Sequence, residues 1–263
     1  MLIKPQELVH SDRDIRTRNV QYNPAVPFNQ ENAACRCEWG VAGHDGLAKA
    51  EVVIVVDVLS FCTCVDIALA RGAIIFPYPW KDSTARAFAK MQRAELAGRR
   101  GEARYSLSPA SFLDAPTGLR CVLPSPNGAM LALRATTTGA AVLSGCLRNA
   151  EAVAKAARKL GSSFNVCPAG ERWPDGSLRP SIEDWFCAGA VLKLLPGTKS
   201  PEAVAAIAAF ESSQHTLLES LTASGSGREL IARGFAKDVE LAAQFNVSEH
   251  VPKLEQNSFV AQS

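Results

Sequence analysis

From about residue 50 onward, unbroken apolar runs rich in β-branched residues alternate with alanine-rich stretches that have helical spacing. A short polar or glycine-containing loop separates the members of each pair. Four pairs follow this plan, and their ranges are 50–59 with 63–72, 118–128 with 129–137, 139–147 with 148–161, and 162–171 with 181–195. The alternation predicts strands followed by helices, which is typical of an α/β fold. Because the runs are continuously apolar, we expect the strands to be buried on both faces of a mostly parallel or mixed sheet.

The pattern changes at both ends of the chain. Residues 1–30 are polar and have no clear period, so they predict an N-terminal arm. After Pro196 the spacing is helical throughout. One long helix is expected over 200–224, with Ser200 as its cap and Pro201 in its first turn, followed by two shorter helices over 224–234 and 236–246.

The sequence therefore predicts one three-layer α/β/α domain over residues 31–254, with a helical C-terminal part. The segment after residue 246 has no period, and residues 255–263 are expected to form an irregular tail. No fixed-period repeat accompanies the strand–helix units. The C-terminal helices could pack internally or against a second subunit, so a homodimer stays open.

Composition narrows the class of protein. The chain has 263 residues, of which 47% are hydrophobic and 21% charged, and its net charge is +2. This balance favours neither a nucleic-acid nor a membrane partner. No apolar run has the roughly 20 residues of a membrane span, and residues 1–19 contain no signal-peptide core. We expect a cytoplasmic protein.

The eight cysteines are interpreted as buried, reduced thiols. Cys35 and Cys37, like Cys62 and Cys64, stand one residue apart, which is closer than the usual spacing of zinc ligands, and neither pair has a nearby histidine.

Asp57 interrupts the apolar run that begins at Val52, and a buried carboxylate is costly unless something pairs with it. It could simply cap the following helix. However, ligands of open α/β sheets bind where strands end and helices begin, and helix N-termini there favour anions. The position at the end of a buried run therefore makes Asp57 a candidate site residue, with Ser60 beside it.

Three other strand–helix junctions also carry polar residues. The second has an Asn-Gly dipeptide, which is equally typical of a plain turn. The third has an arginine that could be a surface residue. The fourth has acidic residues that could be only helix-dipole partners. The candidates at these junctions are Ser125, Asn127 and Gly128; Ser144, Gly145 and Arg148; and Glu171, Arg172, Glu183 and Asp184.

If Asp57, Glu171, Glu183 and Asp184 meet at one edge of the sheet, they repel one another. A hard divalent cation would relieve that repulsion, and an oxygen-only ligand set suits Mg²⁺. These four carboxylates are thus the candidate metal ligands.

Several segments, taken together and in order, are similar to the 2-phosphosulfolactate phosphatase (ComB) family. They are "VVIVVDVLSFCTCVDIALARGA", "SPNGAMLAL", "SGCLRNAEAVA", "CPAGERWPDGSLRPSIEDWFCAGAV" and "GRELIARGFAKDVELAAQFNVSEHVPKL". The resemblance implies a Mg²⁺-dependent phosphatase with an α/β/α fold. Such enzymes convert 2-phosphosulfolactate to sulfolactate and phosphate on the route to coenzyme M.

This chain departs from the family pattern at two junctions. Ser60 stands where the family usually has arginine, and "GCLRNA" replaces a "GSFLNA"-like element, which adds Arg148. Because arginine suits phosphate and sulfonate, the departure at Ser60 bears on the substrate.

The working hypothesis is metal-assisted hydrolysis of a small anionic phosphate ester, with Asp57, Glu171 and Asn127 as catalytic residues. Backbone N–H groups near Gly128 and Gly145, with the hydroxyls at the junctions, would bind the phosphoryl group. Arg148 and Arg172 would hold the carboxylate or sulfonate end. The substrate-binding set is Ser60, Ser125, Gly128, Ser144, Gly145, Arg148 and Arg172.

Other chemistries are open or disfavoured. Asp57 could instead form an aspartyl phosphate, although Leu59 stands where haloacid dehalogenase phosphatases have their second aspartate. No cysteine opens a C-x5-R loop, and no P-loop is present. A degenerate protein that only binds anions, or a phosphatase for a different phosphorylated hydroxy acid, remains an alternative.

Overall fold

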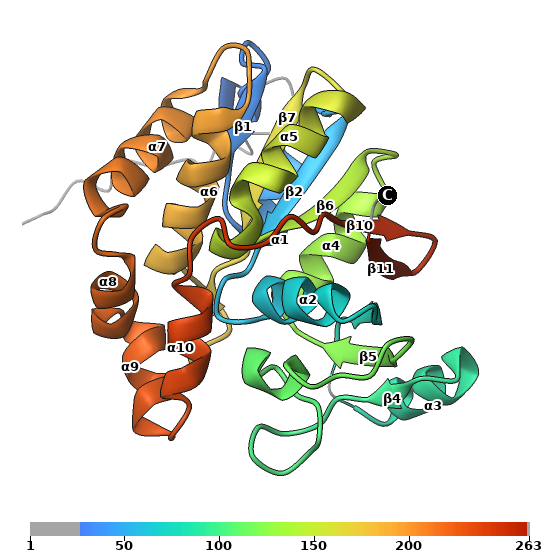
Figure 1. Cartoon of the computed structure of the whole chain (residues 1–263). Helices are drawn as coiled ribbons and strands as arrows, with labels where there is room; N and C mark the ends of the chain where they lie inside the picture. The colour runs from blue at the N-terminus through green and yellow to red at the C-terminus, as the bar shows by residue number, and fades with distance from the viewer. Residues whose placement is uncertain (1–26, 81, 262–263) are drawn as a thin grey trace, which may run out of the picture.

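The computed structural model describes residues 27–80 and 82–261, so residues 1–26 of the expected arm lie outside the described part. Within the described part, a nine-stranded sheet has the order β1-β7-β2-β6-β10-β11-β3-β5-β4 (Figure 1). Its strands are β1 (Cys35–Cys37), β2 (Val52–Val56), β3 (Ile74–Tyr78), β4 (Glu95–Leu96), β5 (Arg120–Pro124), β6 (Ala141–Gly145), β7 (Phe164–Pro168), β10 (Pro252–Glu255) and β11 (Ser258–Ala261).

The sheet is mixed and mostly parallel, as predicted. Its two parallel parts, β1-β7-β2-β6 and β3-β5-β4, are joined by the antiparallel hairpin β10–β11. Leu143 of β6 pairs with Lys253, and Ile75 of β3 pairs with Phe259.

This hairpin corrects the expectation of an irregular tail. Residues 258–261 form an inner strand of the sheet, and the Phe259 side chain is fully buried. The segment is short and polar at its turn, so its strand pattern is weak in the sequence. Pairing of β11 with β10 and β3 supplies backbone hydrogen bonds that the local sequence pattern does not predict.

Helices cover both faces of the sheet and complete the three layers. Val53 and Val55 of β2 pack in the core beneath α2 and α4, whereas Val52, Ile54 and Val56 pack on the other face with α5 and α6. The helices are α1 (Gly40–Gly46), α2 (Phe61–Ala70), α3 (Ser83–Gln92), α4 (Gly128–Thr136), α5 (Ala150–Leu160), α6 (Ile182–Leu194), α7 (Pro201–Ser213), α8 (Leu217–Ala223), α9 (Gly225–Ala232) and α10 (Ala236–Ala242).

The helical C-terminal part is present, but its first helix is divided. Ser200 caps α7 by accepting the N–H of Ala203, as expected. The single helix predicted over 200–224 is instead broken into α7 and α8. The interruption falls at the polar run 212–216, where the hydroxyls of Ser212 and Thr216 hydrogen-bond to nearby backbone carbonyls and compete with the helical ladder.

Short elements complete the description: the 3₁₀ turns Pro27–Asn29, Pro109–Phe112 and Leu147–Asn149, and the hairpin of β8 (Glu171–Arg172) and β9 (Leu178–Arg179). In Figure 1, α8, α9 and α10 gather at one end of the molecule, where α10 contacts the turn Pro109–Phe112. This contact matters because it brings C-terminal helices close to the connection between β4 and β5.

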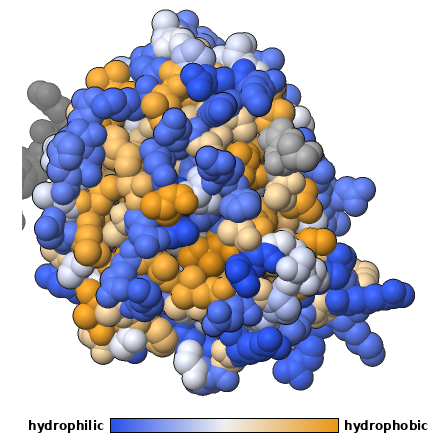
Figure 2. All heavy atoms as spheres, viewed as in Figure 1, coloured by the Kyte–Doolittle hydropathy of each residue, from blue (hydrophilic) through white to orange (hydrophobic). Residues whose placement is uncertain are grey.

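All eight cysteines lie in the described part, buried and unpaired, which confirms their interpretation as structural thiols. None of the helices in residues 27–80 and 82–261 has the length and apolar character that crossing a membrane requires. On the face seen in Figure 2, hydrophilic side chains interrupt the apolar surface.

Candidate active site

A cavity of about 620 Å³ opens at the carboxyl ends of the strands. Asp57 follows β2, Asn127 follows β5 and Glu171 begins the hairpin after β7, so three separate junctions contribute to its wall. Predicted site residues that line it are Asp57, Ser60, Ser125, Asn127 and Glu171. Parallel strands bring their ends to one edge, which explains why residues far apart in sequence meet here.

Asp57 joins the N-termini of two helices. Its Oδ1 accepts the N–H of Phe61, the first residue of α2, at 3.1 Å, and its Oδ2 accepts the N–H of Gly128, the first residue of α4, at 2.9 Å. Asp57 is only 6% exposed. Both contacts stabilise the charged form, yet burial outweighs them and raises the pKa of Asp57 to about 6.

Gly128 must be glycine for this arrangement. A Cβ built there would lie 2.5 Å from Asp57 Oδ2 and 2.7 Å from the ring of Phe61. Because the Gly128 N–H is already donated to Asp57, it is not the free phosphate-binding donor that the sequence predicts.

Glu171 and Asn127 form a polar pair in the cavity wall. Asn127 Nδ2 donates to Glu171 Oε2 at 3.0 Å. Burial, together with the negative charge of Asp57, raises the pKa of Glu171 to about 7, while Arg179 acts in the opposite direction. A carboxyl group with a pKa near neutrality is suited to accept and release a proton.

Asp184 ties two of the junctions together. Its Oδ1 accepts the N–H of Val58 at 2.7 Å, and its Oδ2 accepts the N–H of Gly170 at 2.9 Å. Burial, and then the charges of Asp57 and Glu183, raise the pKa of Asp184 well above its usual value. Since both oxygens already accept backbone hydrogen bonds, Asp184 fixes the ends of β2 and β7 relative to each other.

Glu183 is a further buried carboxylate close to these groups. The residue is 2% exposed and its charge acts on Asp57, Glu171 and Asp184, yet within the described residues no donor hydrogen-bonds to its carboxylate. In the same part of the chain, no three metal-ligating side chains form a ready-made metal site. The oxygen-only donors nevertheless fit Mg²⁺, which commonly uses one or two carboxylates together with water and phosphate.

The cations of the cavity come from segments that the sequence analysis did not single out. Arg100, between β4 and β5, donates from Nε to the Leu107 carbonyl at 2.7 Å and from Nη2 to Ser60 Oγ at 2.6 Å. Arg99 and Arg233 also line the cavity. The only sequence signal was the consecutive Arg99–Arg100 pair between two glycines.

Other predicted residues lie outside this wall. Arg148 Nε is 2.8 Å from Asp66 Oδ2, and the same guanidinium contacts Gln244. Arg172 lines a neighbouring cavity of about 400 Å³, which shares Pro126, Asn127 and Glu171 with the first.

Ser144 and Gly145 are buried at the end of β6 rather than in the cavity wall. The hydroxyl of Ser125 accepts the N–H of Asn127 at 3.3 Å, so this serine also shapes the turn before α4.

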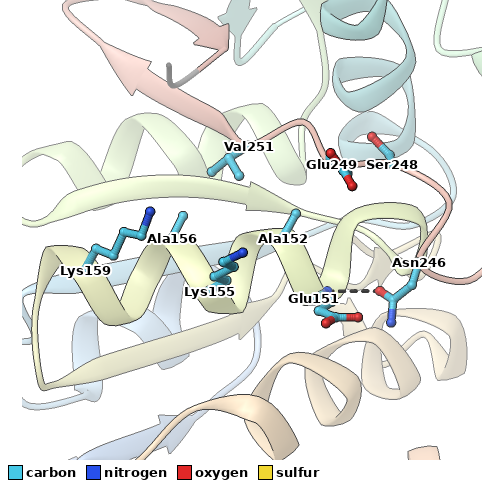
Figure 3. A pocket seen from close by; sticks show the side chains of 9 residues that line it. All are labelled: Glu151, Ala152, Lys155, Ala156, Lys159, Asn246, Ser248, Glu249 and Val251. Atoms are coloured by element: carbon cyan, nitrogen blue, oxygen red, sulfur yellow. Dashed lines mark hydrogen bonds between the residues drawn. The ribbon is translucent and has the colours of Figure 1, made fainter.

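Figure 3 shows a different cavity, of about 420 Å³, between α5 and the segment 246–251. Its labelled charged side chains include Lys155 and Lys159, and Asn246 Oδ1 accepts the N–H of Glu151. None of the predicted site residues lines it. The strand-end cavity is therefore the candidate active site.

Comparison with known proteins indicates the family of the chain. A family model described as 2-phosphosulpholactate phosphatase matches residues 42–257. The probable 2-phosphosulfolactate phosphatase of Carboxydothermus hydrogenoformans is 33% identical over 78% of this chain and 87% of its own length. That of Thermus thermophilus is 33% identical over 79% and 90%. The 2-phosphosulfolactate phosphatase of Methanothermobacter thermautotrophicus is 33% identical over 50% and 54%.

Proposed function

The chain belongs to the 2-phosphosulfolactate phosphatase family, and we propose that it hydrolyses the phosphate monoester of a small acidic hydroxy acid. The observation that carries this proposal is the strand-end cavity, whose lining combines the buried Asp57 and the half-buried Glu171 with Arg99, Arg100 and Arg233. Three arginines in the lining suit a substrate that carries a phosphate and a further anionic group.

Mg²⁺ is the proposed cofactor. Its protein ligands would be Asp57, which lines the cavity, and Glu183, which is buried outside the cavity lining and whose charge acts on Asp57. Asp184 is less suited because it does not line the cavity and its two hydrogen bonds join the ends of β2 and β7, whereas Asp57 lines the cavity. When bound, the ion would neutralise phosphate charge and lower the pKa of an attacking water.

Other residues of the cavity would position the carboxylate, accept the proton and bind the substrate. Asn127 Nδ2, which donates to Glu171, holds that carboxylate in the wall and orients it toward the cavity. Glu171 would take the proton of the attacking water, because its pKa of about 7 allows both protonation states near neutral pH. The hydroxyl of Ser60, held by Arg100, would donate a hydrogen bond to the phosphate or the adjacent carboxylate.

Arg100 is the proposed contact for the second anionic group of the substrate. Its Nη2 reaches Ser60 and thus supplies a guanidinium beside the position at which the family resemblance leads one to expect an arginine. The names of the relatives make 2-phosphosulfolactate the first substrate to test, with sulfolactate and phosphate as products.

The test measures phosphate release from 2-phosphosulfolactate and 2-phospholactate, with Mg²⁺ and with a chelator. Asp57→Asn removes a charge from the cavity and should lower kcat by about 10²–10³-fold, the range for loss of one electrostatic contact in an active site. Asp114→Asn is the matched control because Asp114 is exposed and does not line the cavity.

A folded wild-type protein that releases no phosphate from either ester would contradict the proposed activity. If that protein still binds sulfolactate by calorimetry, the anion-binding alternative takes its place. The departure at Ser60 is the observation that favours this alternative.

A further inference from the structure

Arg100 is oriented by groups of the C-terminal helices. Its side chain is 12% exposed, and its Nε lies 3.8 Å from Asp238 Oδ2 at the start of α10. Its guanidinium stands over the ring of Phe235, with 5.7 Å between the guanidinium carbon and the ring centroid. Together with the Leu107 carbonyl, which accepts from Nε and Nη2, these contacts hold the guanidinium so that Nη2 also donates to Ser60 in the cavity.

The two oxygens of Asp238 have different surroundings. Oδ1 accepts the hydroxyl of Ser108 at 2.6 Å and the N–H of Ala110 at 3.2 Å, so it fastens α10 to the turn Pro109–Phe112. Oδ2 is buried and accepts no hydrogen bond in the described part of the chain. In that part, Arg100 is also the cation that pairs with Asp238.

The different surroundings of the two Asp238 oxygens have an energetic consequence. A carboxylate oxygen without a partner in a 1% exposed side chain is costly unless a positive charge compensates it. Packing of α10 needs only Oδ1. The charge on Oδ2 acts on the guanidinium of Arg100 from the side of α10, and it favours the orientation in which Nε donates to the Leu107 carbonyl and Nη2 donates to Ser60 in the cavity.

Phe235 extends the same arrangement to a second arginine. The guanidinium carbon of Arg233 lies 5.8 Å from the centroid of the Phe235 ring, which Arg100 also approaches. Both arginines line the strand-end cavity. One aromatic side chain between α9 and α10 thus supports two of the cavity's cations.

We propose that Asp238 is a positioning residue, which acts through Arg100 to set how tightly the cavity binds the anionic group of its substrate other than the phosphate. This inference rests on the proposed function for its substrate class. It predicts that loss of the Asp238 charge weakens recognition of that group and leaves the hydrolytic step nearly unchanged.

The decisive variant is Asp238→Asn, which keeps an oxygen for Ser108 and Ala110 but removes the charge that faces Arg100. We expect KM for 2-phosphosulfolactate to rise about tenfold or more, as for a loosened buried charge contact, with kcat changed less than about twofold. KM for glycerol 2-phosphate, whose alcohol part is neutral, should stay within about twofold of wild type. Binding of sulfolactate, followed by calorimetry without turnover, should weaken by the same factor as KM.

Two controls separate positioning from packing. Ser108→Ala removes the other side-chain partner of Asp238 but keeps its charge, so KM for both esters should stay within about twofold of wild type. In an Arg100→Ala background, Asp238→Asn should have no further effect on KM for 2-phosphosulfolactate, because the two residues then act as a unit. Thermal melting verifies that each variant is folded.

The outcomes are distinguishable. Equal KM increases for both esters in Asp238→Asn, or a loss of kcat alone, would show a merely structural role and overturn the inference while the phosphatase activity stands. No phosphate release by the wild type, together with sulfolactate binding that weakens in Asp238→Asn, would overturn the proposed activity and support the inference. Sulfolactate binding that is unchanged in Asp238→Asn would overturn the inference in either case.

Discussion

At the scale of single residues, backbone hydrogen bonds give different roles to carboxylates that follow similar patterns in the sequence. Asp57 and Asp184 are both buried, and each accepts two backbone N–H groups. The contacts of Asp57 come from two helix N-termini and leave it in the cavity wall, whereas those of Asp184 join two strand ends. Glu183 has no such contacts among the described residues, and its charge acts on both aspartates.

Gly128→Ala should disrupt the site directly. The added Cβ would meet Asp57 Oδ2 at 2.5 Å, so the carboxylate or the start of α4 must move. We expect kcat to fall by about tenfold or more, since small displacements of catalytic groups have large effects, and the free energy of unfolding to fall by about 1–3 kcal/mol.

Gly46→Ala in α1 is the control for that variant. A Cβ at Gly46 meets nothing within 4 Å, so both quantities should stay near the wild-type values. Phosphate-release kinetics and chemical denaturation measure the two effects, and wild-type kinetics in Gly128→Ala would refute the proposed role of the Asp57–Gly128 contact.

At the scale of elements, a buried ion pair connects segments that are distant in sequence. Asp66 of α2 is fully buried and accepts from Arg148 of the turn Leu147–Asn149 at 2.8 Å and from Ser248 at 2.6 Å. Arg148 also contacts Gln244, which follows α10. The arginine that the sequence offers as a substrate contact thus links α2 to the C-terminal segment.

Arg148→Met should therefore affect folding more than catalysis. It leaves Asp66 buried without its cation, which destabilises a protein by about 3–5 kcal/mol. KM for 2-phosphosulfolactate should change less than about twofold, because Arg148 does not line the cavity.

The matched variant Arg134→Met breaks an equally short ion pair with Asp45. The Arg134 side chain is 49% exposed and that of Asp45 is 39% exposed. Its cost should be below about 1 kcal/mol. Urea denaturation compares the two variants, and a large KM increase in Arg148→Met would restore Arg148 as a substrate contact.

At the scale of the whole molecule, the hairpin β10–β11 unites two parallel half-sheets, and the C-terminal helices supply part of the cavity. Ser226 and Glu229 of α9, and Arg233 directly after it, line the cavity together with residues at the strand ends. The site is consequently completed only when the last third of the chain has folded against the first.

The charges of the site should make folding stability depend on pH when no metal is bound. The pKa values of Asp57 and Glu171 are about 6 and about 7 in the folded protein, against ordinary values of 3.8 and 4.5. The folded state therefore binds more protons than the unfolded state between about pH 4 and about pH 7. Their contribution to stability is complete below about pH 4 and is lost as pH rises toward 7.

We expect the melting temperature in chelator to fall across that range, with a shallower fall in Glu171→Gln. Added Mg²⁺ should raise the melting temperature more at about pH 7 than at about pH 5, because its ligands must be deprotonated. Scanning calorimetry provides the measurement. An equal slope in Glu171→Gln, or a Mg²⁺ effect that does not depend on pH, would contradict the charge assignment.

Strand and helix spacing in the sequence correctly predicted the α/β class, the buried run of β2 and the positions of four strand–helix junctions. Each depends on local periodicity and on capping, which neighbouring residues determine. The sequence also indicated that Asp57, Asn127 and Glu171 lie at one edge, because parallel strands align their ends. The local pattern did not predict β11 or the break between α7 and α8. Pairing with two neighbouring strands forms β11, and hydrogen bonds from side chains to backbone carbonyls interrupt the helix.

Only the tertiary structure identified which cations enter the cavity. Arg148 stands next to a predicted junction and yet pairs with Asp66, whereas Arg100 belongs to an unremarkable loop and reaches Ser60. A long side chain is directed by the charges and rings packed around it, such as Asp238 and Phe235, and these come from distant parts of the chain. The sequence by itself determines the strands and helices, because backbone hydrogen bonding is regular and follows local patterns. The positions of the charged side chains in the cavity depend on long-range contacts, which no local pattern encodes.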